Sequence, residues 1–254
     1  MKITSGLIAF STFMVTSMSV SATEIKVMSG GAPKEVFAQL TPIFEQRSGH
    51  RVVFIYDVLT ALREKIAAGE KVDVLVMPVP MLDGYGKDGR LRADSIATFG
   101  IVGTSVVVKE GARQPDISTK EKFREAMLAA RSVVHATPGK TPSGTHMGKV
   151  MEQLGIAETM SKKAIHRPAL EGGVQLVAEG QAEIGIYPAS EVANVKGVTV
   201  VGPLPKGIDL NIVYGGAVAA DSAAGDAPAA FVKFMAAPEN RDTWKNAGFD
   251  PPAS

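Results

Sequence analysis

Two loop-to-helix junctions, far apart in the chain, carry the residue types that bind a small anion. The first contains Ser29 and Gly30, directly after a short apolar run. The second contains Ser143, Gly144 and Thr145, at the start of a helical pattern. The first backbone N–H groups of a helix have no partner within the helix, and the helix dipole is positive at that end. Such helix starts bind anions, so the junctions predict two parts of the chain that face one anion.

Two further helix starts extend this candidate set. Thr60 opens a helical pattern, and Arg63 lies one turn into it, where a guanidinium could clamp a carboxylate. Gly173 and Val174 open another helix after a glycine turn. Each feature also has a purely structural explanation. Thr60 can be a helix cap, Arg63 can lie on a solvated helix face, and the glycines can serve a flexible turn.

One histidine is well placed for proton transfer. His146 lies beside the second junction, and imidazole titrates near neutral pH. Glu171 or His166 could support it as a second proton-transfer group. The alternative is that His146 is a surface residue or is held by an ordinary hydrogen bond. We therefore treat His146 and Glu171 as candidate catalytic residues.

The sequence contains no pattern for a metal or a cofactor. The chain has no cysteine, and its four histidines lack ligand spacing with one another or with carboxylates. It also lacks a phosphate-binding Walker loop and a Gly-x-Ser-x-Gly nucleophile motif. The prediction is a site without metal or cofactor.

The first residues resemble an export signal. Lys2 is followed by an apolar stretch, and 20–22 fits a small-residue cleavage site. We expect residues 1–22 to be removed, which leaves a periplasmic chain without a membrane anchor. Removal of Lys2 leaves 27 − 1 = 26 basic residues against 26 acidic ones. Such a neutral chain has no basic field to attract nucleic acid.

Short apolar, β-branched runs alternate with helical patterns along the chain. The runs at 25–28, 52–56 and 72–77 read as buried strands, and the segments 33–48 and 60–68 as helices. This alternation predicts an α/β fold. Pro42 lies inside the first helical pattern, and we expect a kink or a break there.

The order of elements predicts two lobes. Both chain ends, 23–103 and 215–254, would form lobe I, and residues 104–214 would form an inserted lobe II. The strand patterns at 101–109 and 212–219 would then lie near the hinge.

Several stretches resemble periplasmic molybdate-type solute-binding proteins. They are the Ser-Gly-Gly junction at 29–31, the run 60–74, the stretch 185–191 and the ending 230–249. The resemblance implies a two-lobe, type II periplasmic-binding-protein fold, with mixed sheets, flanking helices and a hinge. The family's pocket tyrosine falls on Pro188, with Tyr187 one residue earlier. The likeness assigns the other ligand contacts to Ser29, Thr60, 142–145, Gly173 and Val174.

A narrower resemblance concerns 111–119, the Pro-Ser-Gly junction and 202–205. These look like a branch that includes a periplasmic aconitate isomerase. Two hypotheses follow. The first is a receptor that binds a small anion between its lobes, an organic di- or tricarboxylate rather than molybdate, for an ABC transporter membrane subunit. Cationic side chains such as Arg63 favour a carboxylate. The alternative is an aconitate isomerase that moves a proton along the bound tricarboxylate.

Overall fold

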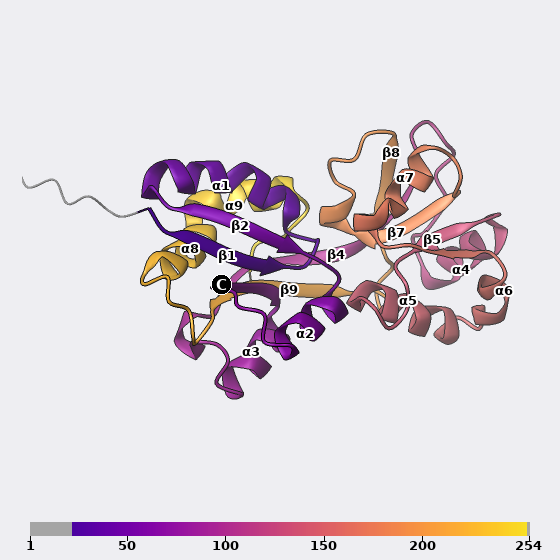
Figure 1. The fold of residues 1–254 in the computed structure, drawn as a ribbon. Helices are drawn as coiled ribbons and strands as arrows, with labels where there is room; N and C mark the ends of the chain where they lie inside the picture. The colour runs from indigo at the N-terminus through magenta and orange to yellow at the C-terminus, as the bar shows by residue number, and fades with distance from the viewer. Residues whose placement is uncertain (1–21, 253–254) are drawn as a thin grey trace, which may run out of the picture.

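Two α/β lobes, joined by two strands, make up the molecule (Figure 1). The computed structural model describes residues 22–252. The predicted export signal therefore lies outside the described residues, except for its last residue. No helix between 22 and 252 combines the length and the apolar character needed to cross a bilayer.

Lobe I is a five-stranded mixed sheet with helices on both faces. Its strand order is β2-β1-β3-β9-β4, in which the first three strands are parallel and β9 is antiparallel to both neighbours. Helices α1, α8 and α9 cover one apolar face, and α2 and α3 cover the other. The strands are β1 (Glu24–Ser29), β2 (Arg51–Tyr56), β3 (Val74–Pro78), β4 (Ala97–Lys109) and β9 (Asn211–Val218). The helices are α1 (Lys34–Ser48), α2 (Leu59–Ala67), α3 (Val79–Lys87), α8 (Ala227–Met235) and α9 (Arg241–Asn246).

Lobe II repeats this layered plan on a smaller scale. The second half of β4 pairs with β7 and β8, and β5 joins β7 to β6 in parallel. Helices α4, α5 and α6 cover one face of this sheet, and α7 covers the other. The strands are β5 (Val133–His135), β6 (Ala164–His166), β7 (Ile184–Pro188) and β8 (Val198–Pro203). The helices are α4 (Lys120–Ala129), α5 (Pro142–Gln153), α6 (Ala157–Ser161) and α7 (Gly173–Ala178).

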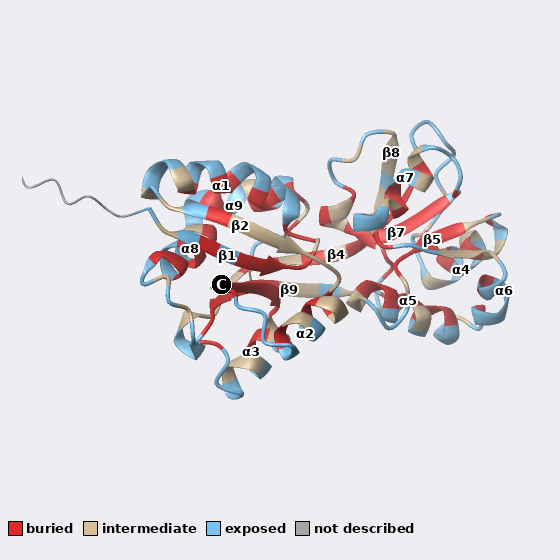
Figure 2. Ribbon diagram, viewed as in Figure 1, coloured by how far each residue is buried: buried red, intermediate tan, exposed pale blue. Residues whose placement is uncertain are grey.

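The burial pattern follows these layers. The central strands are buried, and the helices expose their outer faces to solvent (Figure 2). In β1, for example, Ile25, Val27 and Met28 are fully buried. Such short apolar runs between helices are the expected signature of a sheet covered on both faces. Each lobe therefore has its own hydrophobic core.

Strand β4 belongs to both lobes. Its residues 97–103 pair with β9 in lobe I, and residues 104–108 pair with β7 in lobe II. The chain returns to lobe I at Asn211, where pairing of β9 with β4 begins. Strand β4 thus changes its pairing partner between residues 103 and 104, and the chain re-enters the lobe I sheet at residue 211. The lobe boundaries predicted from sequence, 103–104 and 214–215, stay a prediction.

Helix α1 has no break at Pro42, which was one of the two outcomes expected from sequence. It runs without interruption from Lys34 to Ser48. Phe37 and Leu40 before the proline and Phe44 after it are all buried in the same core. Burial of one apolar face on both sides of Pro42 outweighs the loss of one backbone hydrogen bond.

Phe37 is the aromatic centre of the lobe I core. Its ring centroid lies 5.1 Å from that of Phe54, 6.1 Å from that of Phe231 and 6.0 Å from that of Trp244. We predict that Phe37→Ala lowers the free energy of unfolding by about 3–5 kcal/mol, because it removes a fully buried ring and leaves a cavity. Urea unfolding at an unchanged m-value measures this loss. Ile43→Ala on the exposed side of the same helix is the control, and equal losses in both variants would contradict the prediction.

Candidate functional site

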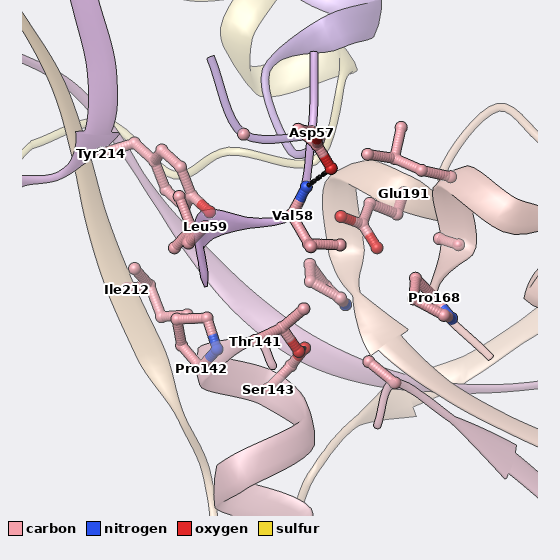
Figure 3. Close-up of a pocket in the computed structure, with 16 residues that line it drawn as sticks. Asp57, Val58, Leu59, Thr141, Pro142, Ser143, Pro168, Glu191, Ile212 and Tyr214 are labelled. Atoms are coloured by element: carbon pink, nitrogen blue, oxygen red, sulfur yellow. Dashed lines mark hydrogen bonds between the residues drawn. The ribbon is translucent and has the colours of Figure 1, made fainter. Parts of the chain in front are cut away.

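A cavity lies between the two lobes, with about 470 Å³ of space among its lining atoms, part of which is open solvent (Figure 3). Lobe I contributes the loop after β1, the start of α2 and two residues of β9. Lobe II contributes the start of α5 and the segments after β6 and β7. The lining residues are Gly30, Gly31, Asp57, Val58, Leu59, Ala136, Thr141, Pro142, Ser143, Pro168, Ala169, Leu170, Pro188, Glu191, Ile212 and Tyr214.

Helix starts from opposite lobes meet at this cavity. Val58 precedes α2 in an extended conformation and gives that helix no side-chain cap. In lobe II, the Thr141 hydroxyl caps α5 by accepting a hydrogen bond from Gly144 N at 3.0 Å. Pro142 occupies the first turn of α5, where its missing N–H is harmless. Both positive helix ends therefore face the same space, which favours a negatively charged ligand.

The loop after β1 forms the opposite wall and allows a close approach of the lobes. Gly30 N donates to Val76 O at 3.3 Å, which ties the loop to the neighbouring strand. A Cβ atom at Gly31 would lie 2.8 Å from Cγ of Leu170. Leu170 belongs to lobe II, and glycine at position 31 leaves room for its side chain at the cavity wall.

Glu191 is the most unusual lining residue. It ends a short 3₁₀ helix after β7 (Ala189–Glu191), and its carboxyl group points into the cavity (Figure 3). Burial raises the pKa of this carboxyl to about 7. Burial also raises the pKa of Tyr214, with the charge of Glu191 as the second cause. The two side chains are therefore electrostatic neighbours in a poorly solvated site.

The lining has no positive side chain among the described residues. Asp57 is a second carboxylate in the lining, and its Oδ1 accepts a hydrogen bond from Val58 N at 2.8 Å. Its other oxygen lies 3.8 Å from Lys65 Nζ, outside the cavity. Attraction for an anion must therefore come from backbone N–H groups, hydroxyls and helix ends.

Two residues predicted from sequence, Gly30 and Ser143, line the cavity. Ser29 is fully buried just behind the lining, and its hydroxyl donates to Gly30 O at 2.9 Å. Gly144 is buried within α5, where a Cβ would lie 2.4 Å from Thr137 O. Thr145 is exposed, and its hydroxyl accepts from Gly139 N at 3.1 Å.

Two other predicted residues, Thr60 and Arg63, lie outside the cavity lining. Thr60 Oγ1 donates to Lys140 O at 3.4 Å, which is a contact between the lobes. Arg63 lines a separate surface hollow beside α2 together with Arg90. Its side chain is exposed and does not line the interlobe cavity. The carboxylate clamp expected from Arg63 is therefore not formed in this arrangement.

The two candidate catalytic residues also lie elsewhere. His146 Nε2 is 2.8 Å from Ile208 O, so that nitrogen donates to a backbone carbonyl of lobe II. Glu171 is exposed, although Leu170 beside it lines the cavity. Neither side chain reaches the cavity, whereas Glu191 does.

The residues at the start of α7 support the cavity from behind. Tyr187 is fully buried, and its hydroxyl donates to Arg167 O at 2.7 Å. Gly173 lies against this ring, since a Cβ there would be 2.1 Å from the Tyr187 hydroxyl. Val174 is buried in the same core. Pro188 lines the cavity and Tyr187 does not, and the predicted contact of Tyr187 with a ligand stays a prediction.

The sequence analysis did not single out Asp57, Glu191, Ile212 or Tyr214 as site residues. A usable signal existed for the two acids. Asp57 directly follows β2, and Glu191 lies three residues after β7. Ligands of open α/β sheets bind beyond the carboxyl ends of strands. An acidic residue at such an end is a candidate for the site.

The raised pKa of Glu191 gives a stability prediction. The unfolded chain loses this proton near the ordinary value of 4.5, whereas the folded protein keeps it up to about 7. Ionised Glu191 therefore destabilises the fold, and the cost develops between these pH values and is complete above them. We predict that Glu191→Gln is more stable than the wild type at pH 8 by on the order of 1–3 kcal/mol. The difference should shrink at pH 5.

Urea unfolding at pH 5 and pH 8 measures both differences. Glu158→Gln, an exposed residue of α6, is the control and should show little pH-dependent change. A difference between wild type and Glu191→Gln that is the same at both pH values would contradict the assigned burial.

Comparison with known proteins agrees with this geometry. The family model of bacterial extracellular solute-binding proteins matches residues 25–250. Aconitate isomerase from Pseudomonas sp is 25% identical, with 90% of this chain and 88% of the relative covered. The molybdate-binding protein ModA from Escherichia coli (strain K12) is 24% identical, with 89% and 88% covered.

A solved structure shows the same fold. The periplasmic molybdate-binding protein of Azotobacter vinelandii gives a TM-score of 0.75 at 18% identity, over 90% of this chain and 100% of that one. The family match, the fold and the interlobe cavity are thus consistent with one another. The chain belongs to the bacterial extracellular solute-binding protein family and has a two-lobe, type II periplasmic-binding-protein fold.

Proposed function

We propose that this protein binds one small organic carboxylate between its lobes in the periplasm. One observation carries the proposal: the starts of α2 in lobe I and α5 in lobe II line the same cavity. Unpaired N–H groups and the Ser143 hydroxyl would hold the carboxylate oxygens. Closure of the lobes would remove water and strengthen these hydrogen bonds.

The walls of the cavity favour an organic acid over molybdate. Leu59, Ile212 and Leu170 present apolar surface, and prolines add more. A carbon skeleton gains from apolar contact, whereas a tetrahedral oxyanion needs donors on every side. Arg63 does not favour a carboxylate ligand in this cavity, because its side chain lines another hollow.

Delivery to an ABC transporter membrane subunit completes the proposal. Its support is the family, together with the predicted export signal. In this scheme the closed, loaded protein presents a surface formed by both lobes. The membrane subunit would then accept the anion when the lobes open.

Ligand binding can be tested on the protein purified without residues 1–22. We predict that citrate or an aconitate raises the melting temperature more than molybdate, tungstate or sulfate does at equal concentration. Calorimetric titration then gives the affinity. A protein stabilised only by the inorganic oxyanions would contradict the organic ligand, and one stabilised by none would contradict the proposal.

Ser143 provides a sharper test of the binding geometry. Ser143→Ala should weaken binding of the organic anion by about 10-fold or more, since it removes a hydrogen bond to a charged group. Thr159→Ala, an exposed residue on α6 of the same lobe, is the matched control. Equal affinities of the two variants would place the anion away from α5.

A second candidate function is aconitate isomerisation, favoured by the position of Glu191 and by the aconitate isomerase relative. In this reaction the Glu191 carboxylate takes a proton from the CH₂ carbon beside the double bond. The released electron pair forms a new double bond as the original one shifts, and the proton is returned to the far carbon. Helix starts would stabilise the negative charge that develops on the ligand's carboxylate oxygens.

This activity has a direct optical test. If the protein is an isomerase, pure wild-type protein interconverts cis- and trans-aconitate, followed by ultraviolet absorbance and chromatography. Glu191→Gln should then lower the rate by about 100-fold or more, since it removes the base. Glu152→Gln, exposed on α5, is the control. If His146→Gln loses the isomerase activity and Glu191→Gln keeps it, the catalytic base is His146 and not Glu191. Absence of wild-type turnover would exclude the isomerase and leave the receptor.

A further inference from the structure

We infer that the anion binds together with one proton carried by the carboxyl group of Glu191, which makes Glu191 a specificity-determining residue of the cavity. The inference rests on the proposed receptor function and not on the isomerase alternative, which needs the Glu191 carboxylate as its base. It adds a chemical requirement: the site accepts its anion only while Glu191 is neutral.

The first support is the position of the carboxyl. Glu191 lines the interlobe cavity and also the groove that continues from it along α1. Its carboxyl points into the space that the helix starts of α2 and α5 share (Figure 3). An anion held by those helix starts would therefore lie next to this group. Two negative charges at close range in a poorly solvated site oppose each other strongly.

The second support is the lack of a compensating cation. Within residues 22–252, no lysine, arginine or histidine forms an ion pair with Glu191. The nearest cationic residue along the groove is Lys34, whose Nζ lies 5.6 Å from the centroid of the Tyr56 ring. The titratable groups around Glu191 come from four segments: Asp57 before α2, Lys34 and Glu35 on α1, Tyr187 on β7, and Tyr214 on β9.

Protonation resolves the conflict. A neutral Glu191 no longer repels the anion, and its O–H can donate a hydrogen bond to a ligand oxygen. The folded protein already holds this proton up to a pKa of about 7, because burial disfavours the carboxylate. The bound anion should raise that pKa further, so binding takes up a proton at neutral and alkaline pH.

The sign of the pH dependence follows. Below about pH 7, Glu191 is neutral before binding, and affinity should change little with pH. Above it, the site must first regain a proton, so affinity falls as pH rises. With one linked proton, the fall approaches 10-fold per pH unit. An anion site built only from N–H groups and hydroxyls would show no such slope.

Calorimetry measures the proton directly. Trans-aconitate and molybdate serve as probes, because both are fully ionised between pH 6.5 and 8.5. Each is titrated in buffers that differ in ionisation enthalpy, which gives the number of protons taken up. We expect uptake approaching one proton at pH 8, less at pH 6.5, and an affinity that falls several-fold to 10-fold per unit above pH 7. Wild-type binding without proton uptake would overturn the inference.

Two variants identify the group. Glu191→Gln keeps a neutral donor of nearly equal shape, so it should bind the probe with affinity independent of pH and without proton uptake. Glu35→Gln, an acid of the adjoining groove, should keep the wild-type uptake. If Glu35→Gln loses the proton uptake and Glu191→Gln keeps it, the assignment of the proton to Glu191 is overturned. The wild-type measurement needs no variant, so the inference can fail even if Glu191→Gln does not fold.

Failure of this inference is distinguishable from failure of the proposed function. Binding of trans-aconitate with constant affinity from pH 6.5 to 8.5 would support the receptor function and contradict the inferred uptake of a proton. Binding of neither probe at any pH would remove the proposed function, and the inference with it.

Discussion

The N–H groups at a helix start need acceptors, and in this protein two such starts, one from each lobe, face the same cavity. Other features of the site can be understood from this constraint. The α2 start has no side-chain cap, and the α5 start has one cap, Thr141. The remaining donors have only solvent or a ligand to bind. A small anion satisfies both sets at once, and only when the lobes approach each other.

A carboxylic acid inside this positive environment creates an electrostatic tension. The helix ends favour negative charge, and burial disfavours it on Glu191. A single proton can satisfy both demands, since it neutralises the acid and leaves the helix ends for the ligand. The apolar walls, formed by residues such as Leu59 and Ile212, strengthen both electrostatic effects because they keep the effective dielectric low.

Much of the architecture could be predicted from sequence, because it depends on local patterns. The alternation of buried strands and amphipathic helices indicated an α/β fold, and the small residues around Gly30 and Ser143 marked two segments that line the same cavity. The break considered at Pro42 does not occur, since tertiary packing of Phe37 and Phe44 holds α1 together across it. Local propensity is a weak guide where a whole helix face is buried.

Side-chain direction was harder to predict than backbone position. Arg63 and His146 were placed near the correct helix starts, but Arg63 lines another hollow and His146 donates to Ile208 O instead of lining the cavity. Glu191 and Tyr214 reach the cavity only because β7 and β9 both pair with β4. Such pairing joins residues distant in sequence, and no local pattern encodes it. The segments that supply hydrogen-bond donors to the cavity could thus be predicted from sequence, whereas the acidic residue Glu191 could not.

The shared strand β4 has a mechanical consequence. Its hydrogen bonds pass from β9 to β7 between Gly103 and Thr104, so each lobe keeps its own ladder. A rotation at that point bends the strand without breaking pairs inside either lobe. The contact from Thr60 to Lys140, at 3.4 Å, is a weak bond between the lobes. Ala189 of lobe II also packs against the lobe I core. Release of a bound molecule would thus depend on these contacts and on the molecule's own contacts with both lobes.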